Sequence, residues 1–400
     1  MGSQLKNLAM VFAEGLGEDR DRFEATASTR IGDGWSSPKD VAKWLVLGCR
    51  KYQGDFFTFD VMSQLVFGAS YDMLNIGENH WIIDGVSGQM RRISFLTQLP
   101  ELEDLRLHKL LFPQARRKAF NLSQKSRQIL EARQQREKES EGVLDRKVDK
   151  KDDLFSKLLS AKDPDTGEGL SQKQLWAESN LLIIAGSDTS STGLAAVFFY
   201  LSRNPDAYRR VTEEVRRVFP RPERVNMGPD LSSCTYLRAC IQEALRMAPA
   251  AGGAMWREAL PGGLQINGRS GADIYVPQGL EVATGIWSLN HNAEYFPEPF
   301  AYRPERWIPG EWPADAAASA KAAFATFSHG PRNCVGKGLA MIEISLAMAV
   351  VISGYDFRRA YSQLGHVGEG EGIFRDQYQT FWAFTSFKDG PFLQFKPVEI

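Results

Sequence analysis

The feature that most constrains the fold is a long apolar stretch in the middle of the chain, SQKQLWAESNLLIIAGSDTSSTGLAAVFFYLSRN, which begins at Ser171. Ser171 followed by Gln174 forms a capping box, which predicts that a helix begins there, and Pro205 would end it. A helix of more than thirty residues that is apolar nearly all round in its middle must be surrounded by other elements. The stretch therefore predicts a large core crossed by one central helix.

The rest of the chain indicates further helices and a small late β region. A turn cluster, DPDTG, lies at 163–167, and the charge run 137–153 is expected to be a solvated loop. Short alternating runs over 264–284 and 378–395 predict small sheets, the second closing around the turn Asp389-Gly390-Pro391. Helical spacing predicts helices over 57–74, 116–136 and 206–218, and one ending at Met247. With no internal repeat in the sequence, we expect one mainly α domain over residues 1–400.

Charge and cysteine content exclude several classes of function. A formal net charge of −1 gives no electrostatic reason to expect nucleic acid as a partner. The four cysteines form no C-x-x-C pair, which favours a reduced intracellular protein over a disulfide scaffold. Apolar runs such as 181–185 and 346–352 are too short to span a bilayer, so no membrane anchor is expected in this sequence.

The centre of the long helix carries an unusual polar segment. Gly186 is followed by six polar residues, 187–192. A buried carboxylate is costly unless it is paired, and Ser and Thr hydroxyls that bond to the preceding turn bend or open a helix. Asp188 and Thr189 therefore predict a local break lined by an acid and an alcohol, a feature that often accompanies function. The alternative is a helix that reaches the surface briefly.

Two other charged residues suggest a buried ion pair. Glu243 and Arg246 stand three residues apart on one helical face, within CIQEALRMAP. Such pairs are abundant on surfaces and contribute little there. Their apolar neighbours indicate a buried setting, where the pair would need a third partner, and Arg306 in YRPERWIPG is a candidate.

Cys334 lies in FATFSHGPRNCVGKGLAMIE, a loop directly before an apolar helix that we expect to begin near Leu339. Glycines at positions 330, 336 and 338 allow the backbone to come close to a flat ligand. The positive end of the following helix and the nearby Arg332 favour a thiolate at this position.

Three interpretations of Cys334 are open on these residues alone. An isolated cysteine is most often buried and inert. A nucleophilic cysteine would need a base, and His329 could serve only if the loop folded back. An axial ligand to haem iron would use the glycine-framed loop, the helix terminus and a cation for a haem propionate.

The sequence resembles the cytochrome P450 family at four ordered places. Residues 327–336, FSHGPRNCVG, match the family signature F-x-x-G-x-R-x-C-x-G position by position. AGSDT at 185–189 resembles the family's oxygen-activation segment, the Glu243 to Arg246 spacing its E-x-x-R pair, and PERW at 304–307 its P-E-R-F/W segment. The resemblance extends roughly from Leu5 to the C-terminus and is to the microsomal-type enzymes of filamentous fungi, many of which tailor secondary metabolites.

The resemblance implies a set of residues for a haem b cofactor. Cys334 would be the axial thiolate, whose electron donation favours cleavage of an iron-bound O–O bond. Arg332 would pair with a haem propionate, with Arg257 as a second partner. Phe327 would pack near the sulfur, and Gly336 would belong to the same cradle.

The resemblance also assigns roles on the long helix and beneath the haem. Asp188 and Thr189 would deliver protons to bound oxygen. Ala185 and Gly186 would leave room for oxygen and substrate beside the iron. The structural triad on the proximal side would be Glu243, Arg246 and Arg306.

The function implied is that of a haem-thiolate monooxygenase with a mainly α cytochrome P450 fold. It would insert one atom of O2 into a hydrophobic small molecule, with the hairpin near 385–387 as one wall of the pocket. Electrons would come from NADPH through cytochrome P450 reductase, at the cytosolic face of the endoplasmic reticulum membrane. A haem-free or non-oxidative relative, such as a cyclase or isomerase, is the alternative, and a cysteine hydrolase using Cys334 and His329 is a weaker one.

The first residues, MGSQLKNLAMVFAEGL, resemble the part of the family that follows its W-x-x-x-R helix. By this alignment we expect the anchor, the first strands and the helices over one haem edge to be absent. Apolar surface should then be exposed at the 264–274 sheet edge and on the distal side of 181–185.

Overall fold

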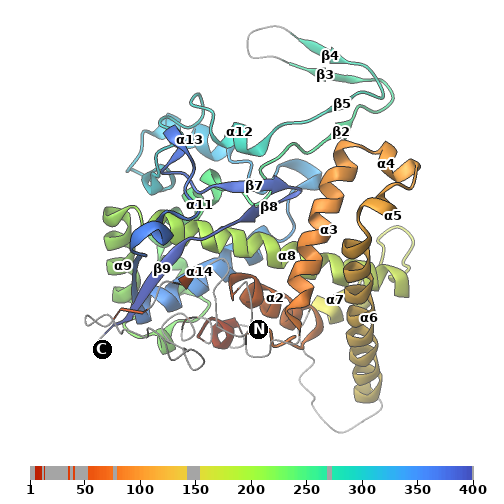
Figure 1. Ribbon diagram of the computed structural model, residues 1–400, viewed down its shortest axis with the longest axis horizontal. Helices are drawn as coiled ribbons and strands as arrows, with labels where there is room; N and C mark the ends of the chain where they lie inside the picture. Colours follow the sequence, from red (N-terminus) through yellow and green to blue (C-terminus); the bar gives the residue numbers. More distant parts are fainter. Residues whose placement is uncertain are drawn as a thin grey trace.

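The computed structural model describes residues 5–10, 13, 35–36, 39–40, 53–74, 79–141, 154–267 and 273–398. Helices dominate this part of the chain, and the strands are short (Figure 1). This agrees with the mainly α fold expected from the sequence. The helices are α2 (Gln53–Phe67), α3 (Trp81–Gln98), α4 (Glu101–Asp104), α5 (His108–Leu111), α6 (Pro113–Glu141), α7 (Leu154–Ser160), α8 (Gln172–Leu201), α9 (Pro205–Val218), α10 (Pro229–Ser233), α11 (Thr235–Met247), α12 (Ile286–Asn290), α13 (Ala314–Ala323) and α14 (Lys337–Gly354).

The apolar stretch forms α8, which crosses the molecule as predicted (Figure 1). Its capping box is present, because the Ser171 side chain accepts from the backbone N–H of Gln174 and the Gln174 side chain accepts from the backbone N–H of Ser171. The C-terminal third, from Thr192 to Leu201, is buried throughout. Helices α2, α11 and α14 pack around it and share one large apolar core with it.

The predicted break in this helix is absent. Helix α8 is continuous through the polar segment. Hydroxyls of this segment bond to carbonyls three or four residues earlier, as Thr189 does to Ala185 at 2.7 Å and Thr192 to Asp188 at 2.9 Å. These bonds satisfy the hydroxyls without removing the helical bonds, so the segment stays regular.

Other predicted boundaries hold apart from four corrections. The helix expected over 57–74 is α2, which begins at Gln53 and ends at Phe67, where Gly68 follows with a positive φ of +63°. Helix α6 continues to Glu141, into the predicted loop, because its charged residues are good helix formers. The helix after Cys334 begins at Lys337, slightly earlier than expected. The Asp389-Gly390-Pro391 turn does not join two paired strands, since β8 pairs with β7, and β9 pairs with β6 and β1.

The strands form small antiparallel ladders at the edges of the helical body. Three strands align in the order β1-β9-β6, and the ladders β2-β5, β3-β4 and β7-β8 have two strands each. Within the β7-β8 ladder, Thr380 lies opposite Lys388. The strands are β1 (Lys39–Asp40), β2 (Arg257–Glu258), β3 (Leu264–Ile266), β4 (Ile274–Val276), β5 (Glu281–Val282), β6 (Tyr355–Arg359), β7 (Thr380–Ala383), β8 (Thr385–Lys388) and β9 (Phe392–Pro397).

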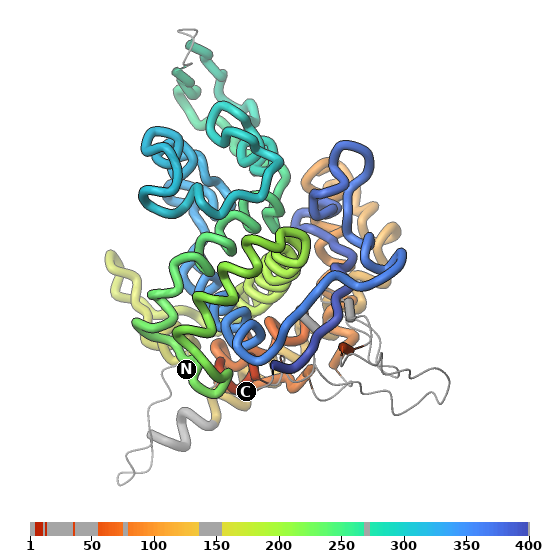
Figure 2. Tube along the Cα trace, turned by 90° about the vertical axis from the view of Figure 1, so that its left-hand side faces the viewer, coloured from red at the N-terminus to blue at the C-terminus, as the bar shows by residue number. Residues whose placement is uncertain are grey.

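The surfaces expected to be uncovered are exposed. The β3-β4 hairpin projects away from the body in both views (Figures 1 and 2), and Leu264 and Ile274 are exposed on it. On α8, Leu181 is 58% exposed while Ile183, on the opposite side, is 2% exposed. The prediction of exposed apolar surface at these two places is therefore confirmed.

Candidate active site

The Cys334 loop presents its thiol at the surface. A single turn of 3-10 helix, Gly330–Arg332, precedes the cysteine, and α14 begins three residues after it. The Cys334 backbone N–H donates to the Phe327 carbonyl at 2.8 Å, which closes the loop. Gly330 has a positive φ of +77°, a conformation that favours glycine. The cysteine is exposed and free.

This exposure excludes one of the three earlier interpretations of Cys334. The buried, inert state is wrong for Cys334, whereas Cys234 and Cys240 are buried. Burial raises the pKa of the Cys234 thiol to about 11 and that of Cys240 further. For a nucleophile, the structure records no hydrogen bond between Cys334 and the exposed His329 within its described residues. The Cys334 thiol is therefore accessible at the surface of the loop.

The surroundings of the thiol fit a flat, largely apolar group with acidic edges. A side chain built at Gly330 or Gly338 would meet nothing within 4 Å, so the loop borders open space. Val335, next to the cysteine, is 92% exposed and adds an apolar side chain to this open side of the loop. Arg332 beside it is also exposed and can pair with an anionic edge. In the described part of the chain no three acidic, histidine or cysteine side chains gather to hold a metal, so an iron here would need a ring to supply its other ligands.

Two other residues expected near the haem occupy different positions. Phe327 is half-buried, its ring contacts Phe324, and the Lys337 ammonium lies 5.8 Å from its centre. Arg257 is exposed on β2, and one of its guanidinium N–H groups donates to the Trp256 carbonyl at 2.7 Å. Among the described residues no hydrogen bond joins Arg257 to the Cys334 loop, and its role as a haem partner stays a prediction.

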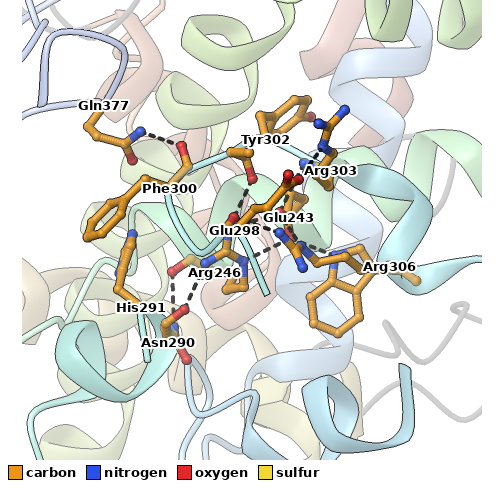
Figure 3. A network of polar contacts seen from close by, with 12 residues as sticks. Glu243, Arg246, Asn290, His291, Glu298, Phe300, Tyr302, Arg303, Arg306 and Gln377 are labelled. Atoms are coloured by element: carbon orange, nitrogen blue, oxygen red, sulfur yellow. Dashed lines mark hydrogen bonds and ion pairs between the residues drawn. The ribbon is translucent and has the colours of Figure 1, made fainter. Parts of the chain in front are cut away.

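A buried ion network is centred on Glu243 and Arg246 of α11 (Figure 3). Glu243 on α11 receives two hydrogen bonds from Arg246, at 2.9 Å each, and one from Arg306 at 3.2 Å. The backbone N–H of Arg303 and the indole N–H of Trp307 complete its partners, at 3.1 and 3.0 Å. Burial by itself would raise the pKa of Glu243, but the two guanidinium groups hold it below its ordinary value. The expected contact with Arg306 is present.

Asn290 connects this network to the cysteine loop. Arg246 donates to the Asn290 carbonyl at 2.7 Å, and the Asn290 side chain donates to the Arg246 carbonyl at 3.1 Å. The same side chain accepts from the backbone N–H of Ala325 and donates to the Thr326 hydroxyl. These two residues lead directly into Phe327, so the ion network holds the start of the loop. Sequence reasoning missed Asn290, because its partners are far away in the chain.

The acid and alcohol of α8 lie on different faces of the helix. Leu181 and Ala185 are exposed, and Thr189, one turn further on, is half-buried. Asp188 is half-buried and turned towards α2 and β8, since its electrostatic neighbours are Lys388 and Asp55. Burial raises the pKa of the Asp188 carboxyl, and Lys388 and a hydrogen bond from Thr385 partly offset this.

Gly186 has a packing role in the structure. A side chain at this position would clash with the Met62 sulfur, 2.5 Å from the ideal Cβ. The glycine therefore lets α2 approach α8 closely. Its expected place in a pocket beside Ala185 stays a prediction.

A second buried glutamate, which sequence reasoning also missed, lies between α14 and α8. Glu343 is 2% exposed, and neither of its carboxyl oxygens has a hydrogen-bond partner among the described residues. Burial raises its pKa to about 8, and the Ser190 hydroxyl on α8 offsets this only slightly. The Glu343 carboxyl is therefore largely protonated at neutral pH.

Comparison with known proteins bears on this arrangement. The family model described as Cytochrome P450 matches residues 55–364. The chain is 60% identical over 393 residues to the cytochrome P450 monooxygenase apf7 of Gibberella fujikuroi, covering 98% of this chain and 71% of that protein. It is 41% identical to the cytochrome P450 monooxygenase apf8 of the same organism, over 86% of this chain and 90% of that protein. The crystal structure of the cytochrome P450DA haem domain superposes with a TM-score of 0.70 at 19% identity, covering all of this chain and 73% of that one.

Proposed function

The chain belongs to the cytochrome P450 family and is a monooxygenase of that family, and from this we propose that it binds haem b through Cys334 and oxidises a hydrophobic small molecule. The observation that carries the proposal is the exposed Cys334 thiol in its glycine-framed loop at the N-terminus of α14. Bound haem would supply the binding and activation of dioxygen, one atom of which enters the substrate. The fungal relatives support a place in secondary metabolism.

The residues of this chain would do the remaining work. The N-terminus of α14 and the Arg332 guanidinium follow and precede Cys334 closely in the chain, and both carry positive charge. Arg332 would hold an acidic edge of the cofactor, with Arg257 as a second candidate. Ala185, exposed on α8, would border the substrate together with Gly186. The expected proton donors are Asp188, whose carboxyl pKa is raised by burial, and Thr189, whose hydroxyl lies one residue further along α8.

Electrons would come from NADPH through cytochrome P450 reductase, and we propose the cytosolic face of the endoplasmic reticulum as the location. Two helices, α8 and α14, are long and apolar enough to cross a membrane by length and composition. More than half of the apolar window of each, 61% and 56%, is buried inside the fold, as in core helices. They therefore add no support for membrane insertion.

The test is the absorption spectrum of the purified protein. Reduced and carbon monoxide-bound, it should show the red-shifted Soret band that thiolate ligation produces. Cys334→Ala should abolish that band, while Cys234→Ala, which removes a buried thiol far from the loop in sequence, should keep it. Retention of the band in Cys334→Ala would overturn the assignment. A haem-free preparation of the unaltered chain would favour the non-oxidative alternative instead.

A further inference from the structure

Two side chains from outside α11 close the C-terminal end of this helix. The last carbonyls of an α-helix have no partner within the helix and need one elsewhere when the end is buried. The Thr326 hydroxyl donates to the Leu245 carbonyl at 2.9 Å, and the Asn290 side chain donates to the Arg246 carbonyl at 3.1 Å. Asn290 ends α12, and Thr326 stands at the start of the cysteine loop. The end of α11 is therefore joined to that loop.

The Asn290 amide also holds the first two residues of the loop directly. It donates to the Thr326 hydroxyl at 2.9 Å, and its oxygen accepts from the Ala325 backbone N–H at 3.1 Å. The N–H groups and the oxygen of this amide are thus all in use, and the side chain is fully buried. An apolar side chain of the same size would leave the Arg246 carbonyl and the Ala325 N–H without these partners.

Two backbone hydrogen bonds continue from the anchored residues to Cys334. The Ser328 N–H donates to the Ala325 carbonyl at 2.8 Å, which closes a turn in which Ser328 has a φ of +57°. The Cys334 N–H donates to the Phe327 carbonyl at 2.8 Å. Because Phe327 directly follows the two residues that Asn290 holds, the Cys334 backbone is one hydrogen bond away from an anchored segment.

The buried ion network holds Asn290 from the other side. The Arg246 guanidinium donates to the Asn290 backbone carbonyl at 2.7 Å (Figure 3). The same guanidinium forms the buried ion pair with Glu243. All three residues are fully buried, and a buried polar network whose members are satisfied is rigid. Asn290 is therefore the side chain through which this rigid network reaches the loop.

We propose that Asn290 is a positioning residue for the haem ligand: by closing the end of α11 and holding the first residues of the loop, it fixes where the Cys334 sulfur stands. This rests on the proposed function, in which Cys334 binds haem iron. The role belongs to the side-chain amide, since the backbone carbonyl of any residue at position 290 can accept from Arg246. A loop without this anchor would hold the sulfur less firmly, so that thiolate ligation would be incomplete.

Three variants separate the amide from its surroundings. Asn290→Leu removes the three side-chain hydrogen bonds and keeps the size of the side chain. Thr326→Val removes only the hydroxyl and leaves the bonds of Asn290 to Arg246 and Ala325 in place. Asn292→Leu is the matched control, the same substitution at an exposed asparagine two residues further on.

The first measurement is hydrogen exchange of the backbone amides in the full chain, followed on peptides that cover 324–336. Exchange there should rise about tenfold in Asn290→Leu, because the Ala325 N–H loses its acceptor and the turn opens more often. It should rise less in Thr326→Val and not at all in Asn292→Leu.

The second measurement is the spectrum of the haem-loaded, reduced and carbon monoxide-bound protein. The share of the haem that shows the thiolate-type Soret band should fall in Asn290→Leu, fall less in Thr326→Val and stay unchanged in Asn292→Leu. Ile82→Ala, which removes a buried side chain of α3, lowers global stability without removing any of these hydrogen bonds. It should leave both the band and the loop exchange unchanged.

Each outcome decides one claim. Unchanged exchange over 324–336, or an unchanged share of the thiolate band, in Asn290→Leu would overturn the positioning role. Equal changes in Ile82→Ala would show that the loop only follows global stability, and would overturn it too. If Asn290→Leu does not fold, as judged by circular dichroism, Thr326→Val must show both changes for the role to stand. Faster loop exchange in Asn290→Leu, in a chain whose unaltered form shows no thiolate band, would support the anchoring and contradict the proposed function.

Discussion

Two buried glutamates in this molecule are held in opposite ways. Glu243, on α11, is surrounded by donors from Arg246, Arg306, Trp307 and the Arg303 backbone, and its pKa is below the ordinary value. Glu343, between α14 and α8, has no hydrogen-bond partner among the described residues, and its pKa is raised to about 8. The fold therefore buries one carboxyl by neutralising its charge with partners and the other by keeping its proton.

Glu243 and Glu343 should make the stability of the protein depend on pH in opposite directions. Glu243, whose pKa falls on folding, stabilises the native state above the ordinary value of 4.5, and this contribution is lost as the pH falls through its lowered pKa. Glu343, whose pKa rises, stabilises the native state below 4.5, and this contribution is lost as the pH rises through about 8. The two regions should therefore fail at opposite ends of the pH range.

The largest effect should come from removing an arginine partner of Glu243. Arg246→Met removes two of the hydrogen bonds to Glu243 and the contact to Asn290, and it leaves a buried carboxylate short of charge. We expect a loss of about 3–5 kcal/mol in the free energy of unfolding, measured by urea denaturation at pH 7. Arg209→Met, an exposed arginine on α9, is the control and should change little. A loss below about 1 kcal/mol in Arg246→Met would show that Arg306 alone holds Glu243.

Replacing Glu343, which has no hydrogen-bond partner among the described residues, should instead raise the stability of the chain at high pH. Glu343→Gln removes the ionisation but keeps the shape, so at pH 9 the variant should be more stable than the unaltered chain by about 4 kcal/mol. At pH 5, where the carboxyl is protonated, the two should differ little. Thermal unfolding measured at both pH values checks this. Equal stability at pH 9 would mean that a partner satisfies the ionised Glu343 carboxylate.

The smallest effect should come from removing a single hydrogen-bond donor to Glu243. Trp307→Phe removes one N–H donor from Glu243 and keeps most of the ring that packs on Phe324. Because four other hydrogen bonds remain on the carboxylate, we expect a loss of only about 1.5 kcal/mol, together with a small rise in the pKa of Glu243. Acid unfolding should then begin at a higher pH than in the unaltered chain. An unchanged acid transition would show that the indole N–H contributes nothing to the charge balance.

Local sequence patterns were sufficient to predict most of the helices and several of the contacts. The capping box placed the start of α8, and apolar spacing placed α9 and α11. The Glu243–Arg246 contact follows from helical spacing, and the glycine-framed Cys334 loop stands before α14 as the sequence indicates. These features depend on neighbours within a few residues, which is the range over which backbone preference and helical period act.

Tertiary structure alone decided how each buried charge is satisfied. Nothing near Glu343 in the sequence shows that it would face Ser190 without a partner, and nothing near Lys388 shows that it would meet Asp55, 333 residues away. The expected break in α8 failed for the same reason, because its hydroxyls and Asp188 found partners within the helix and on α2 and β8. The sequence determined which groups could ionise. Packing determined their solvation and their nearest charge, and these two quantities set the state of a buried carboxyl.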